Sequence, residues 1–246
     1  MGQKQENERF WVIQQAAGSR IADVYIFGDI CEWAFTDYGE VSSHTIKEEL
    51  AAIDADEIRL HINSSGGSVK EGWGIYNTLM EHPAKIISFA DGFVASAAMY
   101  PFLAGDERHA TELSAFYLHE ASGWASGYAD TLRKAADDID FMTERGQKAF
   151  VTRAGMKLDD VKELMEKETW ISPEQAVAFG IAHDVLRNGA QAGVNQSVKR
   201  KIMQKVTGLD YPGEDRKREQ KNAEPAAGTQ GGEPHRNRFF ERYRKV

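Results

Sequence analysis

Two strand–turn–helix units follow each other directly in this sequence, and they constrain the fold more than any other feature. Residues 57–63, EIRLHIN, are typical of a buried strand; the small residues SSGG and a helical pattern that ends at Pro83 follow them. The second unit repeats this order, with a strand-like run KIISFADGF at 85–93 and a run of small and apolar residues, ASAAMYPFLAG, at 95–105. This alternation predicts an α/β domain.

The remaining elements are predicted from their hydrophobic periodicity. Runs typical of extended chain are at 24–30 and 109–121, and helical spacing is found at 41–53, 129–154 and 157–167. Ser172 followed by Pro173 is typical of a helix N-cap and a helix start. Pro101 predicts a kink or an early end of the helical run that contains it.

The charge of the chain is unevenly distributed. Residues 199–246 contain 13 Lys and Arg against 7 Asp and Glu, so they carry +6, and residues 1–198 carry −14 within a formal net charge of −8. The final segment is also polar and contains Gly and Pro, which predicts disorder. We therefore expect three parts: an N-terminal segment at 1–20, an α/β domain at 21–187 and a polar basic tail at 188–246.

Composition excludes several classes of protein. The single cysteine, Cys31, cannot form an internal disulfide or a thiolate zinc site, so we expect no structural metal. No run approaches the roughly 18 apolar residues of a membrane span, and the opening MGQKQENERF has no apolar signal-peptide core. We expect a soluble cytoplasmic protein with neither a membrane nor a nucleic-acid partner.

The turn at the start of the second helical run could carry a nucleophile. Ser96 lies at a strand-to-helix turn, where a hydroxyl projects and unpaired backbone N–H groups can hold an anion. The alanines around it leave space for a substrate carbonyl. Gly66 and Gly67 would let a second backbone N–H approach the same point. A helix cap or a tight-packing residue is the alternative interpretation of Ser96.

A serine nucleophile needs a base and an orienting carboxylate. His119, at the end of the apolar run AFYL, is the best candidate for the base. The other six histidines show no spacing that indicates a metal pair. Glu166 and Glu168 both precede Trp170, and spacing alone does not choose between them for the carboxylate.

Four segments, in order, resemble those of the Clp protease proteolytic subunit family, the S14 serine peptidases. HINSSGGSVKEGWGIYNTL is similar to that family's I-N-S-P-G-G-S-V segment, and ADGFVASAAMYPFLAG is similar to its G-x-A-A-S-M segment. AFYLHEASGWASG is similar to its M-I-H-x-P-x-G segment, and KETWISPEQAVAFGIAHDV to its D-x-F-x-S-A-x-E-A-x-x-Y-G-L-I-D segment. The resemblance spans about Val24 to Val185.

The resemblance implies a role for each matching residue. These roles are nucleophile for Ser96, general base for His119, and oxyanion hole for the backbone N–H groups of Gly67 and Ala97. The family's aspartate falls at Glu168, whose extra methylene changes its reach, and Glu166 is the alternative. The mechanism implied is peptide hydrolysis through an acyl-enzyme, with no cofactor.

The resemblance also implies an architecture. It is a Clp protease and crotonase-like spiral of strand-strand-helix units, with a long protruding helix at about 129–154 that serves ring stacking in a homo-oligomer. A crotonase-type acyl-CoA enzyme and a catalytically idle capsid-assembly scaffold component are the alternative functions.

The E-T-W variant and the long tail are more similar to the Clp-type head maturation proteases of phages and prophages. That subtype implies scaffold, portal or capsid proteins as substrates or partners, in the cytoplasm of a bacterium or an infected cell. It leaves open whether an AAA+ ATPase assists the enzyme or hydrolysis is independent of ATP.

Overall fold

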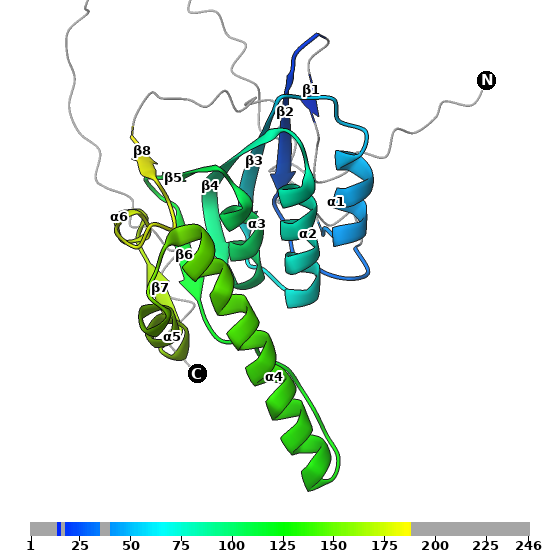
Figure 1. The fold of residues 1–246 in the computed structure, drawn as a ribbon, viewed down its shortest axis with the longest axis vertical. Coiled ribbons are helices and arrows are strands. Elements are labelled where there is room, and N and C mark those ends of the chain that lie inside the picture. Colours follow the sequence, from blue (N-terminus) through cyan, green and yellow to red (C-terminus); the bar gives the residue numbers. More distant parts are fainter. Residues whose placement is uncertain (1–13, 16–17, 35–39, 188–246) are drawn as a thin grey trace, which may run out of the picture. The chain divides into compact units, whose positions relative to one another are not determined.

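The computed structural model describes residues 14–15, 18–34 and 40–187. The predicted segment at 1–20 lies mostly outside these residues, and the predicted tail at 188–246 lies outside them entirely. The described chain is a mixed α/β fold in which helices pack against a central sheet (Figure 1). The predicted fold class is therefore confirmed.

Eight strands of the described chain form one sheet. They are β1 (Gln14–Gln15), β2 (Ile21–Ile26), β3 (Glu57–Ser64), β4 (Lys85–Ala95), β5 (Glu107–Thr111), β6 (Ala115–Leu118), β7 (Thr169–Ile171) and β8 (Asp184–Leu186). Their order is β1-β2-β3-β4-β5-β8, with β6 paired to β4 and β7 paired to β6 outside this path. All of these pairs are parallel except β1 with β2 and β6 with β7. The turns that follow β3 and β4 therefore meet at one edge of the sheet.

Strand β4 divides the sheet into two branches. Its first part, Ile87–Ala90, pairs with β5, and its last part, Phe93–Ala95, pairs with β6. Asn63 supports the change of direction, because its Oδ1 accepts the Phe93 N–H at 3.0 Å. A Cβ at Gly92 would lie 2.4 Å from that same Oδ1, so a larger residue there would displace the Asn63 side chain. The branch carries β4 beyond β5 and directly beside β6.

Strand β2 differs from its prediction. It begins at Ile21 and ends at Ile26, rather than covering 24–30. The chain leaves the sheet after Ile26, and Ile30 instead forms single bridges with Val41 and Gly67. The Ile30 N–H donates to the Gly66 carbonyl at 2.8 Å, so this segment braces the glycine turn after β3.

Helices α1 (Ser43–Leu50), α2 (Val69–Glu81) and α3 (Met99–Ala104) cover one face of the sheet (Figure 1). The alternating side chains of the strands point into this layer, and Leu60 and Ile62 of β3 are fully buried there. Each such side chain contributes roughly 1.5–3 kcal/mol through burial. A 3-10 turn, Ser96–Ala98, precedes α3, and Pro101 falls in the first turn of α3, where its missing N–H costs no hydrogen bond.

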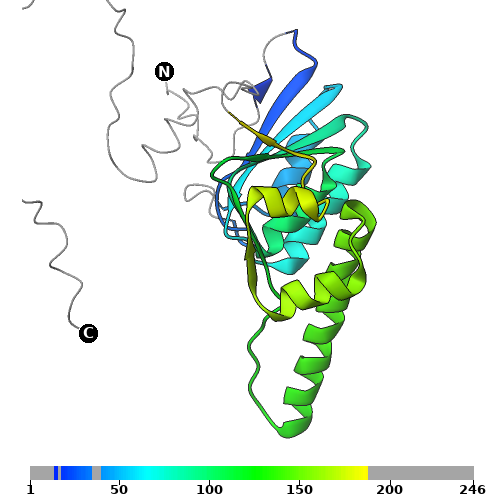
Figure 2. The ribbon, with the colours of Figure 1, turned by 90° about the vertical axis from the view of Figure 1, so that its left-hand side faces the viewer.

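The predicted long helix is present. Helix α4 (Ala129–Ala149) continues as a π-helical turn, Phe150–Ala154, and it extends away from the sheet (Figures 1 and 2). Only Thr143, Gly146 and Gln147 of α4 are buried. The loop between β6 and α4 runs back along the helix (Figure 2), and the Ala121 N–H donates to Thr143 Oγ1 at 3.0 Å.

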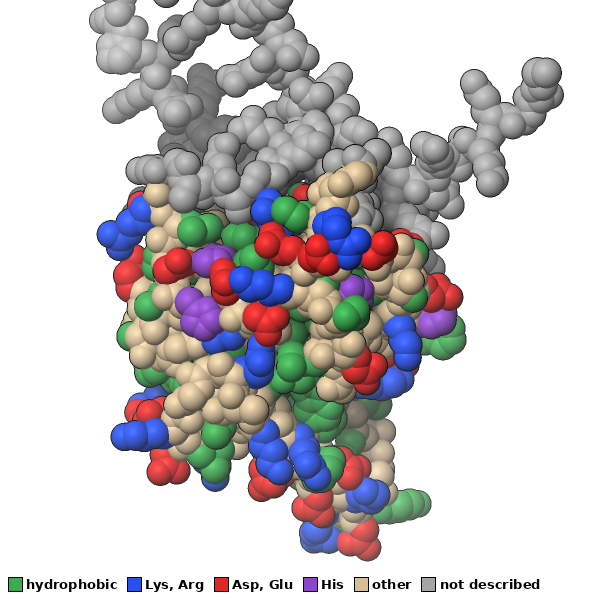
Figure 3. Space-filling view, turned by 45° about the horizontal axis from the view of Figure 1, so that its top comes forward, with side chains coloured by type: hydrophobic (Ala, Val, Ile, Leu, Met, Phe, Trp, Pro, Cys, Tyr) green, Lys and Arg blue, Asp and Glu red, His purple; other side chains and the backbone are tan. Residues whose placement is uncertain are grey.

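The last helices are α5 (Leu158–Glu166) and α6 (Pro173–Ala178). The predicted N-cap of α6 is confirmed, because the Ser172 side chain accepts the Gln175 N–H. In the described part of the chain, no helix is long and apolar enough to cross a membrane. Acidic and basic side chains are interspersed on the face shown in Figure 3.

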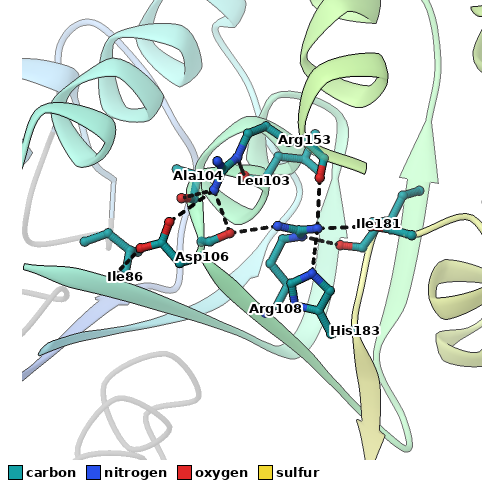
Figure 4. Close-up of polar contacts among 10 residues, drawn as sticks. Ile86, Leu103, Ala104, Asp106, Arg108, Arg153, Ile181 and His183 are labelled. Atoms are coloured by element: carbon teal, nitrogen blue, oxygen red, sulfur yellow. Dashed lines mark hydrogen bonds and ion pairs between the residues drawn. The ribbon is translucent and has the colours of Figure 1, made fainter. Parts of the chain in front are cut away.

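Two arginines, Arg108 and Arg153, join the end of α3 to segments that are distant in sequence (Figure 4). The buried Arg108 guanidinium donates to the carbonyl oxygens of Gly105, Arg153, Gly180 and Ile181. The Arg153 guanidinium donates to the carbonyl oxygens of Leu103, Ala104 and Gly105. Hydrogen bonds from a charged donor contribute more than neutral ones. This cluster therefore anchors the C-terminal end of α3, whose preceding turn carries Ser96.

Candidate active site

Ser96 lies where β4 ends and the 3-10 turn begins. Its φ is 53°, in the left-handed region that non-glycine residues rarely adopt. Ala95, Ala97 and Ala98 are buried around it, so the packing of small side chains holds this sharp turn. The hydroxyl therefore projects from a rigid backbone, as the sequence predicted.

His119 follows β6 and lies against this hydroxyl. Its Nε2 is 2.7 Å from Ser96 Oγ, which is hydrogen-bonding distance. The pairing of β4 with β6 explains the contact, because Ala95 is in register with Tyr117 and the two strands end at the same edge. The structure thus brings together the two residues that the sequence singled out, 23 positions apart.

The glycine turn after β3 packs directly on the Ser96 turn. A Cβ on Gly66 would lie 2.8 Å from the Ala97 nitrogen and from Ser96 Cβ, so no larger residue fits. Gly67 has a φ of 134°, and its neighbours Gly66 and Ser68 make the backbone hydrogen bonds to Ile30. Among the described residues the Gly67 N–H has no hydrogen-bond acceptor of its own. The predicted donors at 67 and 97 therefore belong to two turns in mutual contact.

Glu168 lies across from His119 by the register of β6 and β7. Tyr117 pairs with Trp170 and Leu118 with Thr169, so the next pair outward is His119 with Glu168. Glu168 is exposed and has a φ of 48°. Together with Ser96 it is one of two non-glycine residues with positive φ in the described chain. Strain of this kind clusters at functional sites.

The side chains of Glu168 and His119 do not form a hydrogen bond with each other. Among the described residues, no Asp or Glu oxygen lies within 4.0 Å of a His119 nitrogen, and Glu168 has no side-chain hydrogen bond. Glu166, the alternative, is exposed at the end of α5. The structure therefore supports Glu168 through strand register and backbone conformation, and the third role stays a prediction.

A small pocket opens beside Ser96 and His119. Its lining is both polar and apolar, and the apolar part comes from α3, β6, the π-helical turn and α5, with the side chains of Met99, Tyr100, Leu118, Phe150 and Met165. Glu120 and Ser122 of the following loop line it as well. The pocket adjoins the nucleophile and can admit part of a bound peptide.

Other reactive side chains lie elsewhere. Burial, followed by the neighbouring Glu40, raises the pKa of the Cys31 thiol to about 11, so this thiol is protonated at neutral pH. His61 binds Asp91, and His109 binds Asp184, at distances of 2.9 and 2.6 Å. In the described residues, no group of three or more His, Cys, Asp or Glu could hold a metal ion.

The aromatic residues beside His119 are not among the predicted site residues. Tyr117 stacks on Trp170, with 4.6 Å between ring centroids, and also lies against the His119 ring. Tyr117 precedes His119 by two residues, and Glu168 precedes Trp170 by two. In paired strands this spacing places Tyr117 and Trp170 on the same face as the proposed catalytic residues. The spacing can be interpreted only when β7 is known to pair with β6. A strand of three residues shows too little alternation to be predicted from sequence.

Comparison with known proteins gives consistent matches. The family model described as Clp protease matches residues 38–189. The ATP-dependent Clp protease proteolytic subunit 1 of Prochlorococcus marinus is 31% identical over 186 residues, which are 71% of this chain and 94% of that protein. Subunit 2 of Synechococcus sp. is 30% identical over 151 residues, or 59% of this chain and 77% of that protein. A mutant ClpP1 from Listeria monocytogenes has a similar fold, with a TM-score of 0.59, 21% identity, and coverage of 68% of this chain and 91% of that one.

The glycine turn generates a testable prediction. Gly67→Ala should lower kcat/KM for a fluorogenic peptide by at least about 100-fold, the loss typical of a removed oxyanion donor. The new Cβ would lie 2.2 Å from the Ile30 carbonyl oxygen, so the turn must move. Gly155→Ala is the control, because Gly155 also has positive φ but nothing within 4 Å of the added Cβ. It should cost about 1–2 kcal/mol in urea unfolding and leave activity unchanged. Normal activity of Gly67→Ala would contradict the role of this turn.

Proposed function

This chain belongs to the Clp protease family, whose members are serine endopeptidases of the S14 type, and we propose that Ser96, His119 and Glu168 are its catalytic triad. The 2.7 Å distance between His119 Nε2 and Ser96 Oγ carries this proposal. A serine hydroxyl is activated by a base within hydrogen-bonding reach, and no other histidine of the described chain contacts this hydroxyl.

The proposed reaction begins with proton transfer. His119 Nε2 takes the Ser96 proton as Oγ attacks the peptide carbonyl carbon, and an imidazolium and a tetrahedral oxyanion form. The imidazolium then protonates the leaving amine, and the C–N bond breaks to give the acyl-enzyme and the free amine. Water, deprotonated by His119, attacks the acyl-enzyme and releases the carboxylate product and Ser96.

The oxyanion is assigned to the backbone N–H groups of Gly67 and Ala97. These two positions lie on turns that touch, and Gly66 allows the close approach. Each donor should contribute about 3 kcal/mol to transition-state stabilisation. The proposed role of Glu168 is to accept the Nδ1–H of His119 and so fix the tautomer that leaves Nε2 free to take the proton.

The other functions considered fit the site less well. A crotonase-type acyl-CoA enzyme needs an oxyanion hole and no serine nucleophile, so the Ser96–His119 contact would have no role in it. An idle scaffold component would not need a strained nucleophile turn, which costs about 1–2 kcal/mol. Both alternatives leave the contact and the strain unexplained.

The proposed oligomeric state of this chain is based on its family. Clp protease family proteins form ring-shaped homo-oligomers and act on protein substrates. For this chain we propose a ring of identical subunits, with the projecting α4 in contacts between rings. The relatives named above are ATP-dependent by name. For this chain, assistance by an AAA+ ATPase and ATP-independent hydrolysis both stay open.

We further propose the phage or prophage head maturation subtype, acting in the cytoplasm of the host cell. The support is in the sequence: the E-T-W segment at 168–170 and the basic tail, which we propose is a separate segment at 188–246 following a catalytic domain at 21–187. Scaffold, portal or capsid proteins would be the substrates or partners. The relatives named above are cellular subunits, so this subtype rests on the sequence features alone.

A fluorophosphonate probe tests the nucleophile. The full-length protein should be labelled at Ser96, as located by peptide mass spectrometry, and Ser96→Ala should show no labelling and no peptidase activity. Ser122→Ala is the matched control, because Ser122 lines the same pocket without contacting His119 in the described structure, and it should label normally. Folded, oligomeric wild-type protein that never labels at Ser96 would overturn the serine peptidase assignment.

The third member of the triad can be tested by paired amide substitutions. Glu168→Gln should lower the second-order rate of probe labelling by about 100-fold or more, because a triad without its carboxylate loses orders of magnitude in rate. Glu166→Gln, with the same change two residues away, should leave the rate within about twofold. The reverse result would move the role to Glu166, and two unchanged rates would reduce the site to a Ser–His pair.

The head maturation subtype can be tested by deletion of 199–246. If this +6 segment directs the enzyme to a capsid scaffold, the truncated enzyme should keep its peptidase activity and be lost from assembled shells, as measured by quantitative mass spectrometry. Incorporation of the truncated enzyme at the wild-type level would remove the targeting role of the tail.

A further inference from the structure

Three aromatic side chains form a continuous row next to His119. The rings of Phe93 and Trp170 are 5.2 Å apart, those of Trp170 and Tyr117 are 4.6 Å apart, and those of Tyr117 and His119 are 5.3 Å apart. Tyr117 and Trp170 are stacked with 27° between their planes, and Tyr117 is tilted by 30° to the imidazole. The imidazole is therefore the last ring of a four-ring row.

Strand pairing builds this row. Tyr117 and Trp170 are directly opposite each other in the antiparallel pair of β6 and β7, which brings their side chains onto the same face. His119 follows Tyr117 by two residues, so it shares that face. Phe93 enters from β4, where it is in register with Ala115. The sheet itself thus sets the position of Tyr117 between the imidazole and Trp170.

The aromatic row contacts the His119 ring, whereas the hydrogen bond to Ser96 uses only its Nε2 atom. Nε2 is engaged with Ser96 Oγ, so the Tyr117 ring lies beside the imidazole without competing for that nitrogen. Trp170 is 52% exposed and Phe93 is 50% exposed, while Tyr117 between Trp170 and His119 is only partly exposed. Tyr117 contacts the rings of both Trp170 and His119, and these contacts limit its rotation.

Charge develops on the imidazole in the proposed reaction. The ring becomes an imidazolium when it takes the Ser96 proton. A cation within about 6 Å of an aromatic centroid is attracted to the electron-rich face, and a Tyr117 whose rotation is limited keeps that face in place. The contact is therefore stronger in the transition state than in the ground state, which is the condition for raising kcat.

We propose that Tyr117, held by Trp170, is a positioning residue that sets the plane of the His119 imidazole and stabilises the imidazolium formed during acyl transfer. This inference rests on the proposed function, because it assigns His119 the role of general base. It adds to that function a source of orientation and charge stabilisation that is distinct from the carboxylate.

Other titratable groups near His119 bear on its pH dependence. Glu120 is the next residue and lines the pocket, Glu168 lies across from His119 by strand register, and Tyr100 lies in the pocket wall. Burial raises the pKa of Tyr100, so this phenol stays neutral through the working range. None of these groups is altered by a substitution at 117, so the pH profile of a Tyr117 variant can be compared directly with that of wild type.

The test compares full-length wild type, Tyr117→Leu and Tyr117→Phe. The readouts are the second-order rate of fluorophosphonate labelling at Ser96 and kcat and KM for a fluorogenic peptide, both across pH. Tyr117→Leu should lower the plateau rate by about threefold to fivefold, as a fall in kcat with little change in KM. The midpoint of the acid limb should also move about half a pH unit lower, because the protonated imidazole has lost its partner. Tyr117→Phe keeps the ring face and should restore both values.

Phe93→Leu is the matched control. It removes an aromatic ring from the same row, with two rings between it and the imidazole, and should leave the acid limb in place. Urea unfolding of each variant across the same pH range gives the folded fraction, and the rates are compared per folded molecule so that lost protein does not imitate a shifted midpoint.

The outcomes separate this inference from the function on which it rests. If wild type labels at Ser96 and Tyr117→Leu has an unchanged midpoint, or if Tyr117→Phe fails to restore it, the role of Tyr117 is wrong and the protease assignment stands. If wild type does not label at Ser96, the proposed function itself fails. A shifted midpoint in Tyr117→Leu, restored in Tyr117→Phe and absent in Phe93→Leu, supports the proposal.

Discussion

The division of β4 between two partner strands is the constraint on which the site depends. A parallel strand normally keeps one neighbour on each side along its length, but β4 pairs with β5 through Ile87–Ala90 and with β6 through Phe93–Ala95. Only the second pairing brings the end of β6, and therefore His119, to the end of β4 and Ser96. The hydrogen bond from the Phe93 N–H to Asn63 supports this change, and a side chain at position 92 would disturb it.

The same edge stores backbone strain that the rest of the fold must offset. Ser96 and Glu168 both have left-handed φ values, each of which costs on the order of 1–2 kcal/mol for a residue with a Cβ. Ser96 and Glu168 are each flanked by well-packed elements. The buried alanines, α3 and the arginine cluster behind it hold the first, while α5 and the pairing of β7 with β6 hold the second. Strain therefore occurs where long-range contacts determine the backbone more strongly than local preference does.

Local pattern was enough to predict the parts of the site that are contiguous in sequence. The Ser96 turn, the glycine turn and the helix that begins at Pro173 each depend on small residues or a capping side chain within a few positions. The branch of β4, the three-residue strand β7 and the stack of Tyr117 on Trp170 could not be predicted in this way, because they are created by pairing between distant segments. For the same reason the predicted strand at 24–30 was wrong at its end. Ile30 bonds to the turn at Gly66 rather than to β3, and nothing in the composition of that run indicates this partner.

Two histidines away from the site affect stability in opposite directions as pH changes, which matters for any interpretation of activity against pH. Burial lowers the pKa of His61, but Asp23 and Asp91 overcome that effect and raise it above 6.5, so its stabilising contribution is complete below that value and is lost as pH rises through the raised pKa. Partial burial and the Arg108 guanidinium lower the pKa of His183, so its contribution is complete above 6.5 and is lost as pH falls. Neither residue contacts the Ser96–His119 pair. Loss of folded protein at low pH also lowers the rate there, so rates are compared per folded molecule. After that correction, a change in the charge partner of His119 is what moves the midpoint of the activity profile. The midpoint, rather than the height, of the acid limb therefore reports on the chemistry at the end of β6.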